Sequence, residues 1–307
     1  MKLYMAGVYT SNFSLQSRLY QRLNAPEKAA RDGVRWFLES YHYIHKQSFV
    51  DRLIMDQVKV FLDSGAFSAF TKGVDVDLPG YCEYIHRNRH IIAEDDGAIL
   101  ASVLDGIGDP AKTLENQLAM EALGVRPLPC FHYGEDERYL EFYIKNYDYI
   151  TIGGMVPIST AQLFYWLDRI WDKYLTDGAG RPRVKVHGFG LTTHSLMVRY
   201  PWYSVDSSRW VQAAAMGGIM LPDWNQIIAV SRESPARKTR NAHFVSLPTP
   251  VKEAILRYVA WSGFEFETLE AQYLSRWCYN LWAFTRMEDL VNAVIPSTFA
   301  LRQGGLF

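Results

Sequence analysis

Short apolar runs alternate with longer helical patterns along the first two thirds of the chain. Eight runs are rich in the branched and aromatic residues typical of buried strands. They cover residues 2–8, 34–41, 58–63, 99–105, 126–131, 149–153, 184–188 and 202–206. Several end in Gly, Asp or His, which is typical of strands that stop at a binding site. The run at 34–41 also fits the continuation of a helix.

The segments between these runs have helical signals. Asp109 followed by Pro110 is a typical helix start. A second helix is predicted to begin at Ser159, with apolar residues on one face at Leu163, Trp166, Leu167 and Ile170. Alternation of strands and helices favours a parallel sheet. About eight such units predict an α/β fold, a closed (β/α)8 barrel of the TIM type. An open doubly wound sheet is the alternative, but no GxGxxG motif supports dinucleotide binding.

The pattern changes near Ala229. Residues 231–243 are polar and basic, which predicts a loop, and the chain from Pro250 onward is helical and rich in aromatic residues. We therefore predict a catalytic barrel over 1–229. We expect 230–307 to form a basic loop and a helical cap packed on the barrel, with its aromatic residues serving mainly as core.

Composition narrows the class of protein. The 307 residues are 49% hydrophobic, enough for a large core, and the formal net charge is −1. Nothing in that charge indicates nucleic acid, although a local basic patch could still bind it. The three cysteines form no CxxC pair, which predicts reduced thiols rather than disulfides or a zinc knuckle. No run approaches the roughly 20 apolar residues of a membrane span, and the N-terminal run is too short for a signal peptide. We expect a soluble, cytoplasmic protein without membrane contact.

Two aspartates mark the most informative motifs. Asp63 lies in the sequence FLDSGAFS at 61–68, and Asp206 lies in YSVDSSRW at 203–210. In each motif, strand-forming residues end on an acid and small residues follow. Barrel enzymes keep their catalytic residues at the carboxyl ends of strands. Two acids placed in this way suggest a nucleophile and a proton carrier that face one pocket.

Other strand ends add groups to the same predicted mouth: Asp105, His132, the Gly153–Gly154 pair, His187 and, beside the first aspartate, Ser64 and Phe67. Carboxylates can accept hydrogen bonds from a heterocycle, glycine backbone can approach a carbonyl closely, and aromatic rings can cover a ring face. The set therefore suits a flat, polar-edged base. No HxH pair is present, and the HxxxH pair of His86 and His90 lies outside these strand ends, where a surface or packing role is expected, so we predict no metal and no cofactor. A metallohydrolase built from Asp63, His132, His187 and Asp206 is an alternative.

Structural roles compete with these assignments. Asp63 is well placed to cap a turn through Ser64, Asp206 to cap the following helix, and Asp105 to form a turn with Gly106. Either histidine, at 132 or 187, could be a satisfied core residue. A serine triad is not supported, because no GxSxG motif exists in the chain.

The order of these motifs resembles that of the guanine transglycosylases, the tRNA-ribosyltransferases that exchange guanine for a 7-deazaguanine base. The family's motifs run in a fixed order: DSGGFQ, a later acid, a Gly-Gly strand end, a Gly-x-Gly strand end and a nucleophilic Asp. This chain has a similar order of motifs over residues 55–220. Ala66 and Ser68 depart from the first motif. Cys278 is the only cysteine after Asp206, so the family's Cys/His zinc site is missing. Compact relatives of this kind resemble the phage and bacterial DNA-guanine transglycosylases of the DpdA group.

That resemblance implies a site and its partners. Asp206 would be the nucleophile and Asp63 the proton carrier. Asp105 would accept from guanine, Gly153 or Gly154 would donate to its O6, Phe67 and His187 would stack on it, and His132 would lie at the rim. DNA, single-stranded or with a flipped base, and a 7-deazaguanine such as preQ0 would be the partners. Phosphate contacts are expected from Arg209, Arg232, Arg237, Lys238 and Arg240. A tRNA substrate or a non-catalytic nucleic-acid-binding barrel are the alternatives, and the oligomeric state is left open.

Overall fold

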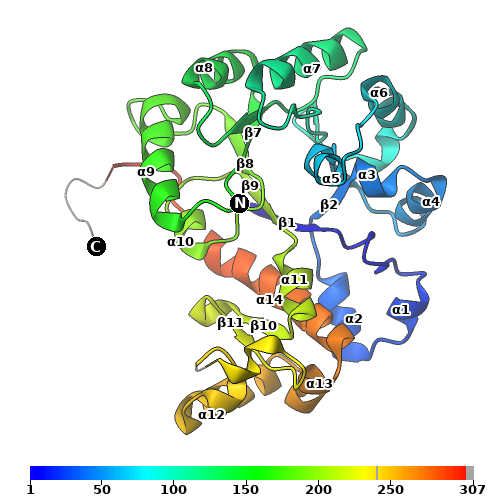
Figure 1. The fold of residues 1–307 in the computed structure, drawn as a ribbon, viewed down its shortest axis with the longest axis vertical. Coiled ribbons are helices and arrows are strands. Elements are labelled where there is room, and N and C mark those ends of the chain that lie inside the picture. The colour runs from blue at the N-terminus through cyan, green and yellow to red at the C-terminus, as the bar shows by residue number, and fades with distance from the viewer. Residues whose placement is uncertain (240, 302–307) are drawn as a thin grey trace. The chain divides into compact units, whose positions relative to one another are not determined.

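The computed structural model describes residues 1–239 and 241–301, which form two compact units (Figure 1). The first unit contains residues 1–14, 36–207 and 294–301 of the described chain. The second contains 15–35 and 208–293. The boundary therefore falls directly after the strand that carries Asp206, whereas the sequence pattern placed it at 229. Residues 15–35 also belong to the second unit, because long-range contacts rather than chain order define it.

A parallel sheet forms the centre of the first unit. Among the described residues it has seven strands, in the order β3-β2-β1-β9-β8-β7-β6. Their bounds are β1 Lys2–Ala6, β2 Phe37–Ser40, β3 Val60–Asp63, β6 Cys130–His132, β7 Tyr149–Gly153, β8 Lys185–Gly188 and β9 Ser204–Ser207. Each neighbouring pair is parallel. The predicted α/β class with a parallel sheet is confirmed, and the uncertain run at 34–41 contains a strand.

The remaining predicted run is hydrogen-bonded on both of its sides. Residues 100–104 follow a two-stranded hairpin of β4 (Glu94–Asp95) and β5 (Ala98–Ile99). Backbone bonds of 2.8 and 2.9 Å join Leu62 to Leu100 and Ser102, and bonds of 2.8 and 3.0 Å join Leu128 to Ala101 and Val103. This segment thus lies between β3 and the chain that leads into β6, which are the two outer strands of the sheet order.

Helices follow most strands and lie around the sheet in Figure 1. They are α3 Tyr41–Ile44, α4 Gln47–Met55, α5 Ala66–Thr71, α6 Leu78–Arg87, α7 Pro110–Ala122, α8 Glu137–Asn146, α9 Thr160–Ile170 and α10 His194–Met197. The predicted helix starts are confirmed: Asp109 caps α7 by accepting from Lys112 N–H, and Ser159 caps α9 by accepting from Gln162 N–H. The apolar face predicted for α9 is buried.

Side chains from several strands meet inside the sheet. Tyr4, Leu38, Phe61, Leu100, Leu128 and Tyr149 form one buried cluster. Below it, at the amino ends of the strands, Asp95 forms ion pairs with Lys2 and Lys185 and accepts a hydrogen bond of 2.7 Å from Tyr203. The hairpin that carries Asp95 is thereby tied to β1 and β8, because both lysines are residues of those strands.

The second unit is mainly helical. It contains α1 Arg18–Gln21, α2 Ala25–Asp32, α11 Arg209–Ala215, α12 Thr249–Trp261, α13 Phe266–Ala271 and α14 Tyr273–Asn292. An antiparallel hairpin of β10 (Gly218–Leu221) and β11 (Gln226–Ala229) joins them, and the sequence pattern did not predict it. Trp277, Tyr279 and Phe284 are buried as expected, whereas Trp261 is 62% exposed. Among its described residues, the predicted loop contains a short 3-10 turn, Pro235–Lys238, and an isolated bridge from His243 to Ala229.

Two further expectations can be compared with the structure. The described residues include all three cysteines, and each is buried with a free thiol. Within the described part of the chain, no helix has both the length and the apolar character that a membrane crossing requires.

Candidate active site

The carboxyl ends of the strands in the first unit hold the polar residues singled out in the sequence. Asp63 and His132 are the last residues of β3 and β6, and Gly153 is the last residue of β7. Asp105 directly follows the segment at 100–104, and Asp206 lies in β9. Because parallel strands end on the same side of a sheet, these groups share one edge.

Asp63 stands at the start of a tight turn. Its Oδ2 accepts a hydrogen bond of 3.0 Å from Gly65 N–H, and its Oδ1 lies 3.5 Å from Ser102 Oγ. The same serine hydroxyl accepts from the buried Ser64 N–H at 2.8 Å. Gly65 has φ +77°, and a Cβ there would lie 2.5 Å from Ser40 Oγ. Glycine is therefore needed at this position, and Asp63 does cap the turn.

The environment of Asp63 favours its protonated form. Burial, and then the negative charges of Asp105 and Asp206, raise its pKa from 3.8 to about 7, against the hydrogen bond from Gly65. These three acids are far apart in sequence, yet their charges interact because the strand ends bring them to one edge. A carboxyl with a pKa near neutrality can both donate and accept a proton at physiological pH.

Asp206 is held by contacts to one of its oxygens. Oδ1 accepts a hydrogen bond of 2.7 Å from Gly190 N–H and lies 3.4 Å from His187 Nε2. His187 Nδ1 in turn lies 2.6 Å from Ser204 Oγ, which is also 2.6 Å from the Tyr149 hydroxyl. The helix after β9 has Ser208 at its N-cap and no side-chain cap. Helix capping, the structural alternative for Asp206, is therefore not its role.

The two rings expected to stack on a ligand lie in different environments. His187 is fully buried, with ring centroids of Phe61 and Phe189 each 4.7 Å away. Stacking on a ligand requires an exposed ring face, so the stacking role assigned to His187 does not fit its burial. The buried ring of His187 instead lies beside Asp206 and can hold its carboxylate in place. Phe67, on α5, is 68% exposed and is available for contact.

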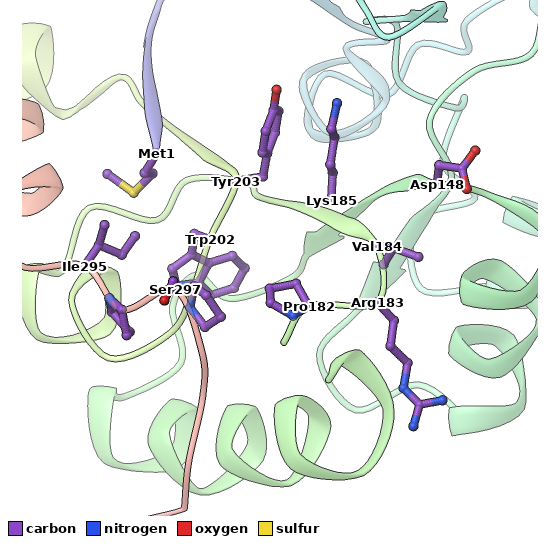
Figure 2. A pocket seen from close by; sticks show the side chains of 12 residues that line it. Met1, Asp148, Pro182, Arg183, Val184, Lys185, Trp202, Tyr203, Ile295 and Ser297 are labelled. Carbon is purple, nitrogen blue, oxygen red and sulfur yellow. The ribbon is translucent and has the colours of Figure 1, made fainter. Parts of the chain in front are cut away.

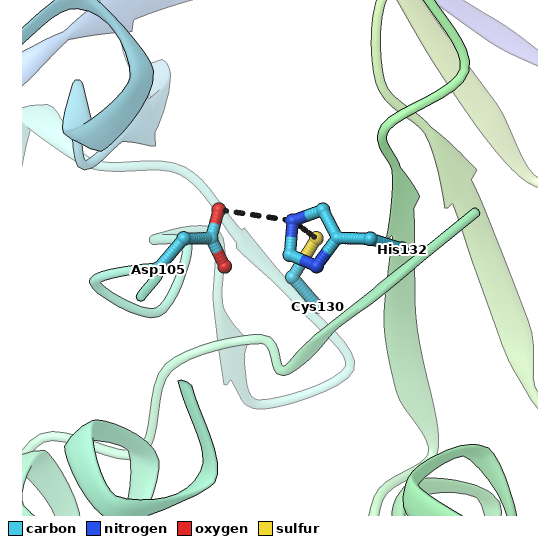
Figure 3. Close-up of side chains that lie close together, drawn as sticks. All are labelled: Asp105, Cys130 and His132. Carbon is cyan, nitrogen blue, oxygen red and sulfur yellow. Dashed lines mark hydrogen bonds and ion pairs between the residues drawn. The ribbon is translucent and has the colours of Figure 1, made fainter. Parts of the chain in front are cut away.

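A compact cluster links Asp105 to the strand end of β6 (Figure 3). His132 Nε2 lies 3.5 Å from Asp105 Oδ2 and 3.4 Å from Cys130 Sγ. On the other side of the ring, His132 Nδ1 lies 2.8 Å from Glu135 Oε1. The second oxygen of that carboxylate accepts a hydrogen bond of 2.9 Å from the backbone N–H of His132. Burial alone would lower the pKa of His132. The Coulomb interaction with Cys130 and the hydrogen bonds to Asp105, Cys130 and Glu135 outweigh burial and raise that pKa.

Cys130 and Glu135 were missed by the sequence reasoning. Cys130 and His132 are two residues apart on a strand, so their side chains point to the same face. That spacing was the available signal. It gave no indication of Asp105, which reaches the same point from a different strand.

The glycine pair leaves space beside this cluster. A Cβ on Gly153 would lie 2.9 Å from His132 Cδ2 and 3.2 Å from Cys130 Sγ. Gly154 has φ +68°, and a Cβ there would lie 3.2 Å from Tyr133 N. Larger residues at either position would displace His132, so the glycines are required for the geometry of the site as well as for access to their backbone.

A separate cavity of about 500 Å³ lies at the opposite end of the strands (Figure 2). It is lined by residues that precede or begin β1, β7, β8 and β9, among them Met1, Asp148, Lys185 and Tyr203. The amino ends of barrel strands generally contribute to stability rather than to chemistry. The acids of the candidate site do not line this cavity.

The predicted phosphate-binding residues belong to the second unit. Arg209, Arg232, Arg237 and Lys238 are exposed. Arg232 forms a 2.7 Å ion pair with Glu270, and Arg237 donates to the carbonyl of Arg232 at 3.0 Å. Arg240 lies outside the described residues. Part of this basic charge is therefore already engaged within the unit.

Comparison of the chain with known families and proteins gives no assignment. No family model matches it, and no curated protein matches it. The interpretation of the site therefore depends on its chemistry and on the motif resemblance.

Proposed function

We propose that this protein is a base-exchange transglycosylase that replaces guanine in DNA with a 7-deazaguanine such as preQ0. The observation that carries the proposal is the burial of Asp63 beside Asp105 and Asp206: burial first, and then the charges of these two acids, raise the pKa of Asp63 to about 7. One acid is thereby suited to carry a proton, while a second remains for nucleophilic attack. The order of motifs along the chain supports guanine as the base.

The proposed scaffold is a TIM-like (β/α)8 barrel. In it, residues 100–104 act as the strand that joins β3 to β6 and closes the ring. The backbone hydrogen bonds on both sides of that segment support this view. A closed barrel would direct every strand end of the first unit toward one mouth.

The proposed reaction has two displacement steps. Asp206 Oδ2 attacks C1′ of the target deoxyguanosine as the C1′–N9 bond breaks, which leaves a sugar ester on the enzyme. Asp63 gives its proton to the departing guanine. The incoming base then loses a proton to Asp63 and attacks C1′, and the ester bond to Asp206 breaks. Since Oδ1 of Asp206 is occupied by Gly190 N–H, Oδ2 is the oxygen that would react.

Recognition of the base would use the neighbouring strand ends. Asp105 Oδ1 is buried and has no hydrogen-bond partner among the described residues, so it is suited to accept from guanine N1–H or its amine. Gly153 or Gly154 N–H would donate to O6, Ser64 would hold the turn, and Phe67 would cover a ring face. His132 would contact the base at the rim. No bound cofactor is needed for these steps.

The choice of DNA follows the compact relatives that the chain resembles. A base inside a duplex must be flipped out or presented on a single strand, at a cost of a few kcal/mol. Exposed Arg209, Arg237 and Lys238 are candidates for phosphate contacts, together with Arg240 and with Arg232 if its pair with Glu270 opens. A role in evading restriction and a cytoplasmic location belong to the same proposal.

Incubation of the protein with DNA and a panel of 7-deazaguanines, followed by nucleoside mass spectrometry, tests the proposal. We expect modified deoxynucleosides without added ATP, and complete loss of them in Asp206→Asn. When the wild-type reaction is stopped early by denaturation, a covalent sugar–protein adduct should be detected, and Asp206→Asn should lack it. Incorporation into tRNA alone would replace DNA as the substrate. Absence of modified deoxynucleosides from both the wild type and Asp206→Asn would contradict base exchange and favour a barrel that only binds nucleic acid, whereas equal incorporation by both would exclude Asp206 as the nucleophile.

A further inference from the structure

We propose that Asp105, Cys130 and His132 bind a zinc ion at the carboxyl ends of the strands, with Glu135 orienting His132. The sequence motifs predict no metal, and the tRNA enzymes that the chain resembles hold a zinc ion after the nucleophile strand. This site is composed of different residues. This metal-site proposal is independent of base exchange, because zinc binding to these residues does not depend on which reaction the protein catalyses.

Distances between the ligand atoms carry the inference. The Oδ, Sγ and Nε2 atoms of the three residues all lie within 4.8 Å of one another. Tetrahedral zinc with ordinary bond lengths would place sulfur and nitrogen about 3.6 Å apart, and nitrogen and oxygen about 3.4 Å apart. The observed separations from His132 Nε2 are 3.4 Å to Cys130 Sγ and 3.5 Å to Asp105 Oδ2. An ion can therefore be bound with small movements of the side chains.

The surroundings of His132 resemble those of a zinc-binding histidine. Glu135 accepts at Nδ1, which fixes the ring so that Nε2 faces Cys130 and Asp105 (Figure 3). Metal-binding histidines usually have such a carboxylate or carbonyl partner on the second nitrogen. The backbone N–H of His132 also donates to Glu135. The carboxylate thus holds the ring through two bonds.

The ligand types select the metal. A thiolate, an imidazole and a carboxylate suit Zn²⁺, whereas Mg²⁺ and Ca²⁺ prefer oxygen alone. Three protein ligands leave a fourth position for water or a substrate atom, as in catalytic rather than structural zinc sites. Cys130 binds as the thiolate, so its proton is released to solvent when the ion enters. Asp105 would use Oδ2 for the metal, and its buried Oδ1 would remain available for a base.

The test measures metal binding by the full chain in the absence of nucleic acid. After chelator treatment and dialysis, the protein is titrated with Zn²⁺ alone against a chromophoric competitor, and its metal content is measured by mass spectrometry. We expect about one equivalent of tightly bound zinc. With Co²⁺ as the probe, we expect a thiolate charge-transfer band in the near ultraviolet.

Variants separate this site from the other cysteines. Cys130→Ser should lose the charge-transfer band and bind zinc at least ten-fold more weakly, whereas Cys82→Ser, at another buried cysteine, should behave as the wild type. Glu135→Gln should weaken binding by about 10–100-fold while the band is kept. Circular dichroism of each zinc-free variant checks folding. Less than a tenth of an equivalent in the wild type, or equal affinity in Cys130→Ser and Cys82→Ser, would overturn the inference. Base exchange is assayed separately, so failure of one proposal leaves the other measurable.

Discussion

Replacing Asp63 with asparagine should stabilise the protein while it removes activity. The carboxyl of Asp63 has its pKa raised from 3.8 to about 7 by burial and by the charges of Asp105 and Asp206. Ionisation of Asp63 therefore opposes folding. An asparagine keeps an acceptor for the Gly65 N–H, which the wild-type side chain binds at 3.0 Å, but it carries no charge.

The sign and size of the effect follow from linkage. The carboxyl has a pKa of 3.8 in the unfolded chain and about 7 in the folded protein. Its contribution to stability is fully present below pH 3.8 and is lost as the pH rises through about 7. At about 1.4 kcal/mol per pKa unit, full ionisation costs about 4 kcal/mol, of which roughly 3 kcal/mol develops between about pH 5 and pH 8. The free energy of unfolding of Asp63→Asn, relative to that of the wild type, should therefore increase by roughly 3 kcal/mol between about pH 5 and pH 8.

Urea unfolding followed by circular dichroism at several pH values measures the difference. Asp75→Asn, at an exposed position in the loop after α5, is the control and should follow the wild type. Nucleoside mass spectrometry on the same samples should show that Asp63→Asn has lost exchange by at least about 10²-fold. A constant stability difference between Asp63→Asn and the wild type across the pH range would refute the reasoning about the buried acid.

Substitutions at three further positions test the scaffold. Gly65→Ala should cost about 1–2 kcal/mol from its positive φ alone, and more from the Cβ contact at 2.5 Å; thermal unfolding and exchange should both fall, and unchanged values would exclude the strained turn. Asp95→Asn should destabilise the chain by about 2 kcal/mol at neutral pH, because Lys185 and Lys2 outweigh burial and lower the pKa of Asp95 to about 2. The wild type should lose this advantage as the pH falls below 4 toward 2, and acid unfolding curves that coincide would contradict it. Glu39→Ala should lower the free energy of unfolding in urea by about 1–3 kcal/mol, because Tyr9 N–H, 2.5 Å from the carboxylate, loses its acceptor. Glu39→Gln should cost less, since an amide oxygen can still accept. A larger loss in Glu39→Gln than in Glu39→Ala would be inconsistent with that hydrogen bond.

Much of the first unit could be predicted from local signals. Strand runs, helix caps at Asp109 and Ser159, and the buried face of α9 depend on periodicity and on hydrogen bonds between near neighbours. The placement of Asp63 and Asp206 at strand ends follows from the same signals. By contrast, the second unit combines residues 15–35 with 208–293, and no local pattern specifies contacts between such distant segments.

The sequence by itself determined the α/β alternation and the polar residues that end the strands, because both are written in short-range spacing. Only the tertiary structure decided how those residues interact. It buried His187 against aromatic rings, coupled Asp63 to two distant acids, and brought Asp105 within 3.5 Å of His132. Burial and Coulomb interactions depend on neighbours in space, and here those neighbours come from strands separated by many residues along the chain.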